Sequence, residues 1–504
     1  MKLHRDHPPE GTVREWLDAR ADAGGTGFVF PEGASPLSWD SLRSRAREIA
    51  ATLTSQGIAA GESIAIMMPN GRPSFECLFG VLYGGFRATM INLVAGDEAI
   101  SYALSHSEAR FAFVGPEQEE LFSRTTDPAH ITALSPDCDP SPDVPLHEVT
   151  PQSHALLMYT SGTTGRPKGV VHTQSSLLAG GWTTAIAHAL TPEDRGLCVL
   201  PIYHINGLCV TVMGALVSGG SLALVSRFSA SNFWAQAAQS EVTWFSVVPT
   251  IISHLLHSES DPDPDCIARL RFGRSASSAL APEVQRAFET RFGIPIVETM
   301  GLTETAAQIL SNPLPPGTRK IGSPGIGVGN EVAIFDSDFR QLPPGQEGEL
   351  VIRGPNVMLE YLKNPEATAD SFTPDGWLRT GDLGRQDEDG YVFITGRLKE
   401  LIIKGGENIA PREIDEALYS HPDVIEAAAF GRPCTSYGER VEAAVRLRSG
   451  SSVTPSDLIA ICEKRLGKFK SPDQVFLLDE LPKGPSGKIQ RIKIPVEIDR
   501  HMRR

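Results

Sequence analysis

Short apolar runs alternate along much of the chain with segments whose apolar residues follow helical spacing. Near the N-terminus, Ser38 is placed to cap a helix that ends at Gly57, and the apolar run 64–68 follows it. The same order returns with a helix around Phe75 and an apolar run at 88–93. Parallel strands produce this order, because each connecting helix crosses the sheet and covers one of its faces. The sequence therefore predicts an α/β fold whose parallel strands are buried between helices.

The sequence changes character twice towards the C-terminus. From Gly322 onwards, glycine and proline separate short strand-like runs, which predicts a small antiparallel β subdomain. After Gly396, longer helix-like and strand-like runs resume, at 411–420, 424–430, 441–447 and 455–466. We therefore expect a large N-terminal domain, residues 1–395, made of parallel α/β sheets and the β subdomain. A small α+β C-terminal domain, residues 396–504, is expected to follow it.

Composition limits the classes of protein and of partner. The chain has 504 residues, 41% of them hydrophobic, and a formal net charge of −15, which is unfavourable for nucleic-acid binding. Its 7 cysteines form no C-x-x-C pair, which indicates reduced thiols and a cytoplasmic protein rather than disulfides or a zinc site. No apolar signal segment stands at the N-terminus. The uncharged stretch 196–226 is interrupted by Pro201 and Gly219-Gly220, so we interpret it as buried core and expect no integral membrane segment.

A loop rich in glycine and hydroxyl side chains follows the apolar run 155–158; residues 159–170 are Y-T-S-G-T-T-G-R-P-K-G-V. Glycine lets backbone N–H groups turn towards an anion, hydroxyls add donors, and Lys168 adds a mobile positive charge. This combination predicts a polyphosphate site, although its spacing differs from that of the Walker loop. A flexible surface turn is the alternative, and the apolar residues on both sides disfavour it. The predicted phosphate-binding residues are Thr160, Ser161, Gly162, Thr163, Thr164, Gly165 and Lys168.

Two further short motifs suit a nucleotide. In E-T-M-G-L-T-E-T at 298–305, Thr303 can meet a phosphate oxygen and Glu304 can hold Mg²⁺ beside it. A capped helix start is the alternative for this segment. In T-G-D at 380–382, the carboxylate can accept hydrogen bonds from the two ribose hydroxyls. The alternative there is an ordinary Gly-Asp turn.

Five motifs, taken in order, resemble those of the adenylate-forming (ANL) superfamily, which comprises acyl-CoA synthetases, peptide-synthetase adenylation domains and beetle luciferases. The resemblance extends from about Trp39 to Arg491, nearly the whole chain. Three of the motifs are those above, and the other two are K-G-G-E-N-I-A-P at 404–411 and P-K-G-P-S-G-K-I at 482–489. The segment G-R-L-K-E at 396–400 resembles the family's hinge motif, with a charged surface turn as the alternative. The resemblance implies that the C-terminal domain is mobile and swings about a hinge at Lys399.

The resemblance also implies roles for individual residues. Lys488 is the expected catalytic lysine, which bridges the carboxylate and the α-phosphate, and Thr303 and Glu304 act on the phosphates beside it. His204, in Y-H-I-N-G, is expected between the substrate carboxylate and the CoA tunnel, with an ordinary core histidine as the alternative. Met300 stands where the family usually stacks a tyrosine on adenine, and a thioether can still pack against a base. The further expected ATP-binding residues are Ser277, Glu298, Thr299, Met300, Asp382, Arg397 and Lys488. The expected CoA-binding residues are Lys404, Gly405 and Gly406, and the expected acyl pocket consists of His204, Asn206, Arg274 and Met300.

The activity implied is that of an ATP-dependent acid–CoA ligase that uses Mg²⁺ and forms AMP and pyrophosphate. Within the superfamily the chain is most similar to the oxalyl-CoA synthetase branch, for example in R-S-A-S-S-A-L-A-P at 274–282. We therefore expect a short anionic acid such as oxalate or sulfoacetate as the substrate. The alternatives are a medium-chain or aryl acid, a carrier protein as acyl acceptor, a luciferase-like oxygenase, and a non-catalytic nucleotide-binding regulator. The expected partners are the acid, ATP and CoA, and no nucleic acid is expected. A homodimer is possible.

Overall fold

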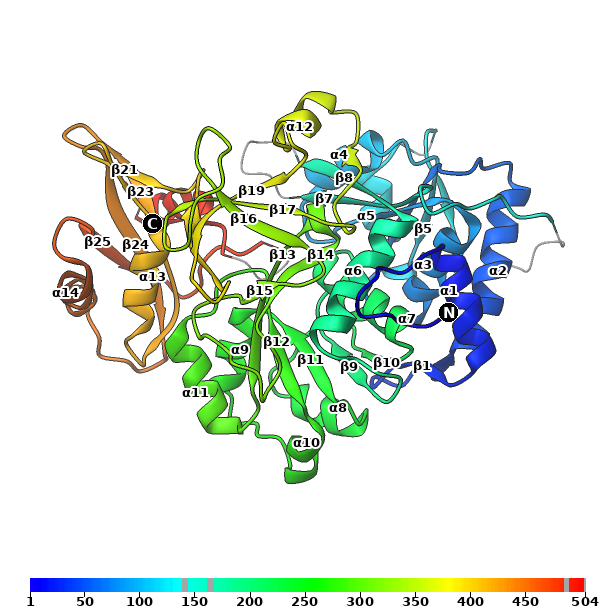
Figure 1. Cartoon of the computed structure of the whole chain (residues 1–504), viewed down its shortest axis with the longest axis horizontal. Coiled ribbons are helices and arrows are strands. Elements are labelled where there is room, and N and C mark those ends of the chain that lie inside the picture. Colours follow the sequence, from blue (N-terminus) through cyan, green and yellow to red (C-terminus); the bar gives the residue numbers. More distant parts are fainter. Residues whose placement is uncertain (128, 138–143, 161–166, 485–488, 503–504) are drawn as a thin grey trace.

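The computed structural model describes residues 1–127, 129–137, 144–160, 167–484 and 489–502. The chain folds into a large N-terminal domain built around several sheets and a small C-terminal domain with a sheet of its own. The C-terminal domain lies at one end of the molecule in Figure 1, coloured orange to red. This architecture confirms the predicted α/β fold class.

The largest sheet crosses the lower part of the molecule in Figure 1. Its strand order is β15 (Ile326–Gly327), β14 (Ala307–Ser311), β13 (Ile296–Leu302), β12 (Phe272–Ser275), β11 (Trp244–Val247), β9 (Arg195–Cys198), β10 (Ser221–Leu224), β1 (Thr26–Val29) and β2 (Leu37–Ser38). The strands from β13 to β1 are parallel, whereas β14, β15 and β2 pair antiparallel at the edges. The carboxyl ends of the parallel strands therefore meet along one edge, where ligand sites of α/β sheets commonly form.

A second sheet lies beside the first. Its order is β18 (Glu360–Tyr361), β8 (Lys168–Thr173), β7 (His154–Thr160), β4 (Arg87–Met90), β3 (Ser63–Met67), β5 (Phe111–Val114) and β6 (Thr132–Leu134). The strands from β7 to β6 are parallel, but β8 and β18 are antiparallel. The predicted parallel sheets thus also contain antiparallel strands at their edges. The physical reason is the short connection from β7 to β8, which leaves no room for a crossover helix.

Helices cover both sheets. They are α1 (Val13–Ala23), α2 (Trp39–Ser55), α3 (Arg72–Gly84), α4 (Asp97–His106), η1 (Pro116–Gln118), α5 (Glu119–Thr125), α6 (Gln174–Ala187), the π-helix η2 (Asn206–Met213), α7 (Gly214–Ser218), α8 (Phe233–Gln239), α9 (Pro249–Leu256), α10 (Pro264–Arg269), α11 (Pro282–Phe292), η3 (Thr303–Thr305) and α12 (Pro365–Asp370). The predicted cap is confirmed, since Ser38 Oγ accepts a hydrogen bond from the N–H of Ser41 at 3.0 Å.

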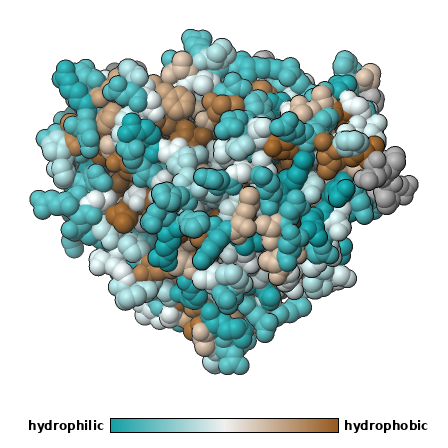
Figure 2. All heavy atoms as spheres, turned by 45° about the vertical axis from the view of Figure 1, so that its right-hand side comes forward, coloured by the Kyte–Doolittle hydropathy of each residue, from teal (hydrophilic) through white to brown (hydrophobic). Residues whose placement is uncertain are grey.

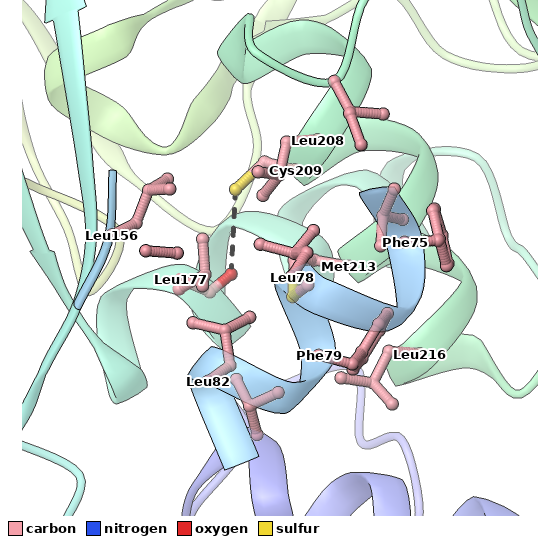
Figure 3. Packing of buried hydrophobic residues seen from close by; sticks show 14 of the residues in the cluster. Phe75, Leu78, Phe79, Leu82, Leu156, Leu177, Leu208, Cys209, Met213 and Leu216 are labelled. Carbon is pink, nitrogen blue, oxygen red and sulfur yellow. Dashed lines mark hydrogen bonds between the residues drawn. The ribbon is translucent and has the colours of Figure 1, made fainter. Parts of the chain in front are cut away.

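The main core lies between the two sheets, where α3, α6, η2 and α7 pack together (Figure 3). Phe75 and Phe79 of α3 point towards this layer, and Cys209 Sγ lies 3.9 Å from the carbonyl oxygen of Leu177. Helix α6 approaches η2 so closely that a Cβ on Gly181 would lie 2.5 Å from the carbonyl oxygen of Met213. The uncharged stretch 196–226 contributes β9, η2, α7 and β10 to this buried layer, as predicted.

The last two sheets belong to the β subdomain and the C-terminal domain. The β subdomain is antiparallel throughout, as predicted, with β16 (Glu331–Phe335), β17 (Gly348–Arg353), β19 (Leu378–Gln386) and β20 (Val392–Arg397). The C-terminal domain contains β21 (Ile402–Lys404), β22 (Glu407–Ile409), α13 (Pro411–Tyr419), β23 (Val424–Cys434), β24 (Gly438–Leu447), α14 (Pro455–Leu466), β25 (Gln474–Leu477), η4 (Arg491–Lys493) and α15 (Ile494–Met502).

The surface is mainly polar on the face shown in Figure 2, where hydrophobic residues form small separate groups. In the part of the chain that the structure describes, no helix combines the length and the apolar character needed to cross a lipid bilayer.

Candidate active site

A buried polar cluster forms where the large sheet meets η2. Arg274, on β12, is 1% exposed, and its Nε donates to Gln308 Oε1 at 3.1 Å. Its Nη1 donates to Asn206 Oδ1 at 2.8 Å and to Ser246 Oγ at 3.1 Å. Asn206 Nδ2 in turn donates to Ser277 Oγ at 3.1 Å. The structure therefore joins three of the predicted residues in one hydrogen-bonded chain, in which Asn206 bonds both Arg274 and Ser277.

The charge of Arg274 is not balanced by an acid. No ion pair between Arg274 and a carboxylate occurs among the described residues. Burial lowers the pKa of its guanidinium to about 9, so the group is still protonated at neutral pH. A buried cation held only by neutral acceptors is costly, which makes an anionic ligand at this position favourable.

The backbone beside this cluster is held in an uncommon conformation. Ser277 has a φ of 73°, in the left-handed region that residues other than glycine rarely adopt. Its hydroxyl is fixed by Asn206, and the neighbouring Thr299 donates to the carbonyl oxygen of Ser275 at 3.3 Å. Such conformations gather at functional sites, where the surrounding structure stabilises them.

Glu298 and Met300 continue β13 from the same place. Glu298 Oε1 accepts a hydrogen bond from the N–H of Leu280 at 3.0 Å, and burial raises the pKa of the carboxyl group. Met300 is half-buried and packs at the edge of the hydrophobic cluster formed by β13, β14 and the β subdomain. An adenine-sized ring could rest against this thioether and the adjoining backbone.

Lys168 and Glu304, predicted from separate motifs, meet through a tyrosine. Lys168 Nζ lies 4.4 Å from the centre of the Tyr361 ring, and Tyr361 donates its hydroxyl hydrogen to Glu304 Oε1 at 2.8 Å. Thr303, beside Glu304, accepts at its backbone oxygen from the His172 ring at 2.7 Å. Tyr361 lies near Lys168 because its strand, β18, pairs with β8, the strand that begins at Lys168.

The donor set around Glu304 fits one mode of magnesium binding. The described residues contain no group of three or more acidic, cysteine or histidine side chains that could enclose a metal. Glu304 is half-buried, and among the described residues one of its two carboxylate oxygens, Oε1, accepts a hydrogen bond, from Tyr361. Mg²⁺ commonly combines one or two carboxylates with phosphate oxygens and water, so Glu304 fits an ion that arrives with a nucleotide.

Asp382 and Arg397 face each other across β19 and β20. Arg397 Nε donates to Asp382 Oδ1 at 2.7 Å, and this carboxylate raises the pKa of the guanidinium. Asp382 is 4% exposed, and its N–H donates to Thr380 Oγ1 at 3.1 Å. The pair thus presents an acceptor and a donor side by side, which suits a ribose with two neighbouring hydroxyls.

His204 lies at the start of η2. Its ring meets that of Tyr203 edge-on, with 5.0 Å between the ring centres, and it is half-buried. Its backbone oxygen accepts from the N–H of Leu208 at 3.0 Å, which joins it to the helix that carries Asn206. A π-helix is rare and is often retained at a functional site, so η2 supports the interpretation of this segment as a pocket wall.

The predicted hinge and CoA residues lie in the C-terminal part. Lys399 is exposed in the turn after β20. Lys404 is buried, with Nζ 3.3 Å from Asp473 Oδ2 and 5.4 Å from the centre of the Phe469 ring. Gly405 and Gly406 follow with φ of 61° and 86°, so this turn requires the left-handed region twice. Both of these contacts of Lys404, with Asp473 and Phe469, lie within the C-terminal domain and not at the Arg274 cluster.

Several predicted residues lie outside the described part of the chain: Ser161, Gly162, Thr163, Thr164, Gly165 and Lys488. The structure also reveals residues that were not selected from the sequence. These are Ser246 and Gln308, which accept hydrogen bonds from Arg274, and Tyr361, which links Lys168 to Glu304. None belongs to a motif, and β11 and β14 are buried at every position, so no alternation along these strands marks Ser246 or Gln308.

Comparison with known proteins matches both parts of the chain. The family model described as AMP-binding enzyme matches residues 17–362, and the one described as AMP-binding enzyme C-terminal domain matches residues 413–488. The chain is 45% identical over 479 residues to a sulfoacetate–CoA ligase of Cupriavidus necator, covering 93% of this chain and 94% of that protein. It is 37% identical over 457 residues to an oxalate–CoA ligase of Arabidopsis thaliana, covering 86% of this chain and 88% of that protein.

The fold is likewise similar to solved structures. ATP-bound MatB from Rhodopseudomonas palustris superimposes with a TM-score of 0.87 at 27% sequence identity, covering 98% of this chain and 100% of that one. The superimposed region covers almost the whole chain. It therefore includes the sheet that carries the Arg274 cluster as well as the small C-terminal domain.

Proposed function

The chain belongs to the AMP-binding enzyme family, and we propose that it is an acid–CoA ligase that activates a short anionic acid such as sulfoacetate or oxalate through an acyl-adenylate. The name of the sulfoacetate–CoA ligase at 45% identity supports this substrate class, as does that of the oxalate–CoA ligase. The acid, ATP and CoA are the small-molecule partners that such a reaction requires.

The observation that carries the proposal is the buried guanidinium of Arg274, which no described carboxylate neutralises. A monocarboxylic acid brings one charge, which is consumed as its carboxylate reacts. Sulfoacetate and oxalate bring a second anionic group, and a buried anion requires a partner. We infer that Arg274 supplies that partner, with Asn206 and His204 lining the same pocket.

In the proposed first half-reaction, the acid's carboxylate attacks the α-phosphorus of ATP, and pyrophosphate leaves as the acyl-adenylate forms. Lys168 and residues 160–165 bind the phosphates, and Asp382 with Arg397 holds the ribose. Ser277, Glu298, Thr299 and Met300 line the adenine side. Lys488 stabilises negative charge as the new bond to phosphorus forms.

Magnesium enters this scheme with ATP, and Glu304 beside Thr303 is the residue that would hold it. The bound ion would neutralise charge on the phosphate oxygens. ATP, Mg²⁺ and CoA are thus the proposed cofactors and cosubstrates.

In the second half-reaction the CoA thiolate attacks the acyl carbonyl, AMP leaves, and the thioester forms. We propose that the domain formed by residues 396–504 turns about Lys399 relative to residues 1–395. Lys404, Gly405 and Gly406 then line the path of the thin pantetheine arm, for which glycine leaves room.

A screen of acids with ATP, Mg²⁺ and CoA, with detection of AMP, tests the substrate class. We expect sulfoacetate or oxalate to give the highest kcat/KM. A higher value for medium-chain or aryl acids contradicts the proposed substrate. AMP formation that needs a carrier protein instead of CoA, or no ATP–pyrophosphate exchange with any acid, contradicts the CoA-ligase function itself.

The location and assembly of the enzyme complete the proposal. Scattered cysteines without disulfides among the described residues support a reducing, cytoplasmic location. A homodimer is the proposed assembly, and light scattering that returns twice the mass of one chain would support it.

A further inference from the structure

Within the described part of the chain, the side chains that accept hydrogen bonds from Arg274 are all uncharged. Gln308 accepts from Nε at 3.1 Å, and Asn206 and Ser246 accept from Nη1 at 2.8 and 3.1 Å. An amide or hydroxyl oxygen satisfies an N–H group without cancelling the charge of the guanidinium. A carboxylate at any of these positions would form an ion pair and cancel that charge.

The orientation of the Gln308 amide follows from its second hydrogen bond. Gln308 is 0% exposed on β14, and its Nε2 donates to the carbonyl oxygen of Thr183, on α6, at 3.3 Å. Because the nitrogen end meets a carbonyl oxygen, the oxygen end must face Arg274. His188 lies near the same amide, but burial lowers the pKa of its ring, so it is neutral and does not alter the charge of the cluster.

The position of Gln308 matters for a second reason. The same amide bonds to Thr183 on α6 and to Arg274 on β12, so it connects β14 to both elements. A hydrocarbon side chain of equal size would keep the packing but lose both hydrogen bonds. A glutamate would keep the bond to Nε and add a negative charge beside it.

We propose that Gln308 is a specificity-determining residue, whose neutral amide accepts a hydrogen bond from Arg274 and leaves its positive charge free for the second anionic group of the acid. This assignment rests on the proposed function, because it presumes that the acid carries such a group. Glutamate at this position would weaken the selectivity, because the ion pair with Arg274 would replace the interaction with the second anionic group of the substrate.

Two substrates of similar shape measure this effect. Sulfoacetate carries two negative charges at neutral pH, whereas methylsulfonylacetate replaces the sulfonate by a neutral sulfone. The preference is the ratio of their kcat/KM values, determined for the wild type, Gln308→Glu and Gln308→Met. Methionine is the matched control, since it has nearly the size of glutamine and removes both hydrogen bonds without adding charge.

We expect the wild type to prefer sulfoacetate and Gln308→Glu to lower that preference by about 10- to 100-fold, the range for one hydrogen-bonded charge. Gln308→Met should lower kcat/KM for both substrates while largely keeping their ratio. Melting temperatures of the three proteins show whether each variant is folded.

Each outcome has one meaning. A preference that survives in Gln308→Glu overturns the assignment of Gln308 alone, as does an equal loss of preference in Gln308→Met. A wild type that does not prefer sulfoacetate contradicts the proposed substrate class, and the assignment falls with it. If Gln308→Glu does not fold, Asn206→Asp places a carboxylate on Nη1 of the same guanidinium, and the preference must fall there instead.

Discussion

At the scale of single residues, Tyr361 shows how a side chain outside every motif can set the position of a predicted one. Its hydroxyl donates to Glu304 at 2.8 Å, and Lys168 lies over its ring. Tyr361→Phe keeps the ring but removes the hydrogen bond that orients the carboxylate. We expect the Mg²⁺ concentration for half-maximal ATP–pyrophosphate exchange to rise by about tenfold, the effect of one hydrogen bond to a charged group.

Tyr391 offers a matched control for this change. Lys320 Nζ lies 4.4 Å from the centre of the Tyr391 ring, and the Tyr391 hydroxyl donates to the carbonyl oxygen of Thr318 at 2.6 Å. Tyr391 thus also combines a lysine over its ring with a hydroxyl hydrogen bond, but without contact to Glu304. Tyr391→Phe should leave the Mg²⁺ dependence unchanged. Glu304→Ala marks the other limit and should abolish exchange while the protein stays folded. Equal shifts in both phenylalanine variants would show that Tyr361 acts only through stability.

At this scale, a site residue could be predicted from the sequence only where it belongs to a motif. Asn206, Arg274 and Ser277 were predicted from segments matched to a family, and Asn206 bonds both of the others in the structure. Gln308 and Tyr361 have no such signal, because a single glutamine or tyrosine in a strand is equally common in a core. Only the pairing of β18 with β8, and of β14 with β13, brings them to the site.

At the scale of elements, α6 packs closely against Ala306, the residue that follows η3 and its Glu304. A Cβ on Gly180 would lie 2.3 Å from the carbonyl oxygen of Ala306, a backbone atom that cannot move aside cheaply. We expect Gly180→Ala to cost about 1–3 kcal/mol of stability, as overpacking typically does, and to weaken MgATP binding. Chemical denaturation and calorimetric titration with MgATP measure the two effects.

Gly214, in the same layer, provides the comparison. A Cβ there would meet its nearest neighbour, Thr184, at an ordinary 3.7 Å. Gly214→Ala should therefore leave MgATP binding unchanged and stabilise the helix slightly, since alanine has the higher helix propensity. A stable Gly180→Ala protein with normal binding would show that α6 does not constrain η3.

The elements that the sequence predicted best have clear boundaries. Residues 111–114, 282–292 and 455–466 match β5, α11 and α14, each bounded by glycine, proline or a capping residue. Helix α6 was not predicted, because it is buried on nearly all sides and shows no polar face. The antiparallel edges also escaped prediction, since strand direction depends on tertiary pairing rather than on the pattern of one strand.

At the scale of the whole molecule, the two domains meet through polar contacts that a rotation could exchange. Arg412, on α13, donates to the carbonyl oxygens of Ile394 and Gly322 at 2.7 and 3.3 Å, and Ser253 of α9 donates to that of Ile425 at 3.2 Å. Backbone oxygens accept from many donors, so these bonds do not commit the domain to one orientation. The sequence indicates two domains, but the pattern within either contains no information on their relative placement.

The last prediction follows from two functional groups on one small domain. If the C-terminal domain presents Lys488 for adenylation and the turn at Gly405-Gly406 for thioester formation, the two half-reactions should fail separately. Lys488→Ala should lower pyrophosphate release by about 100-fold or more, the effect of removing one charge-stabilising donor, yet still convert supplied acyl-adenylate and CoA to the thioester. Gly406→Leu should release pyrophosphate in a single turnover and form no thioester.

Strain alone must be separated from obstruction of the CoA path, because Gly406 has a φ of 86° and leucine is disfavoured there. Gly450 has a φ of 81° in the same domain, and a Cβ at either position would meet nothing within 4 Å. Gly450→Leu therefore introduces equal strain away from the proposed path and should complete both half-reactions. If Gly450→Leu loses thioester formation as Gly406→Leu does, the loss reflects strain in the domain. If Lys488→Ala and Gly406→Leu lose both half-reactions alike while folded, a single fixed arrangement of the domains must serve both steps.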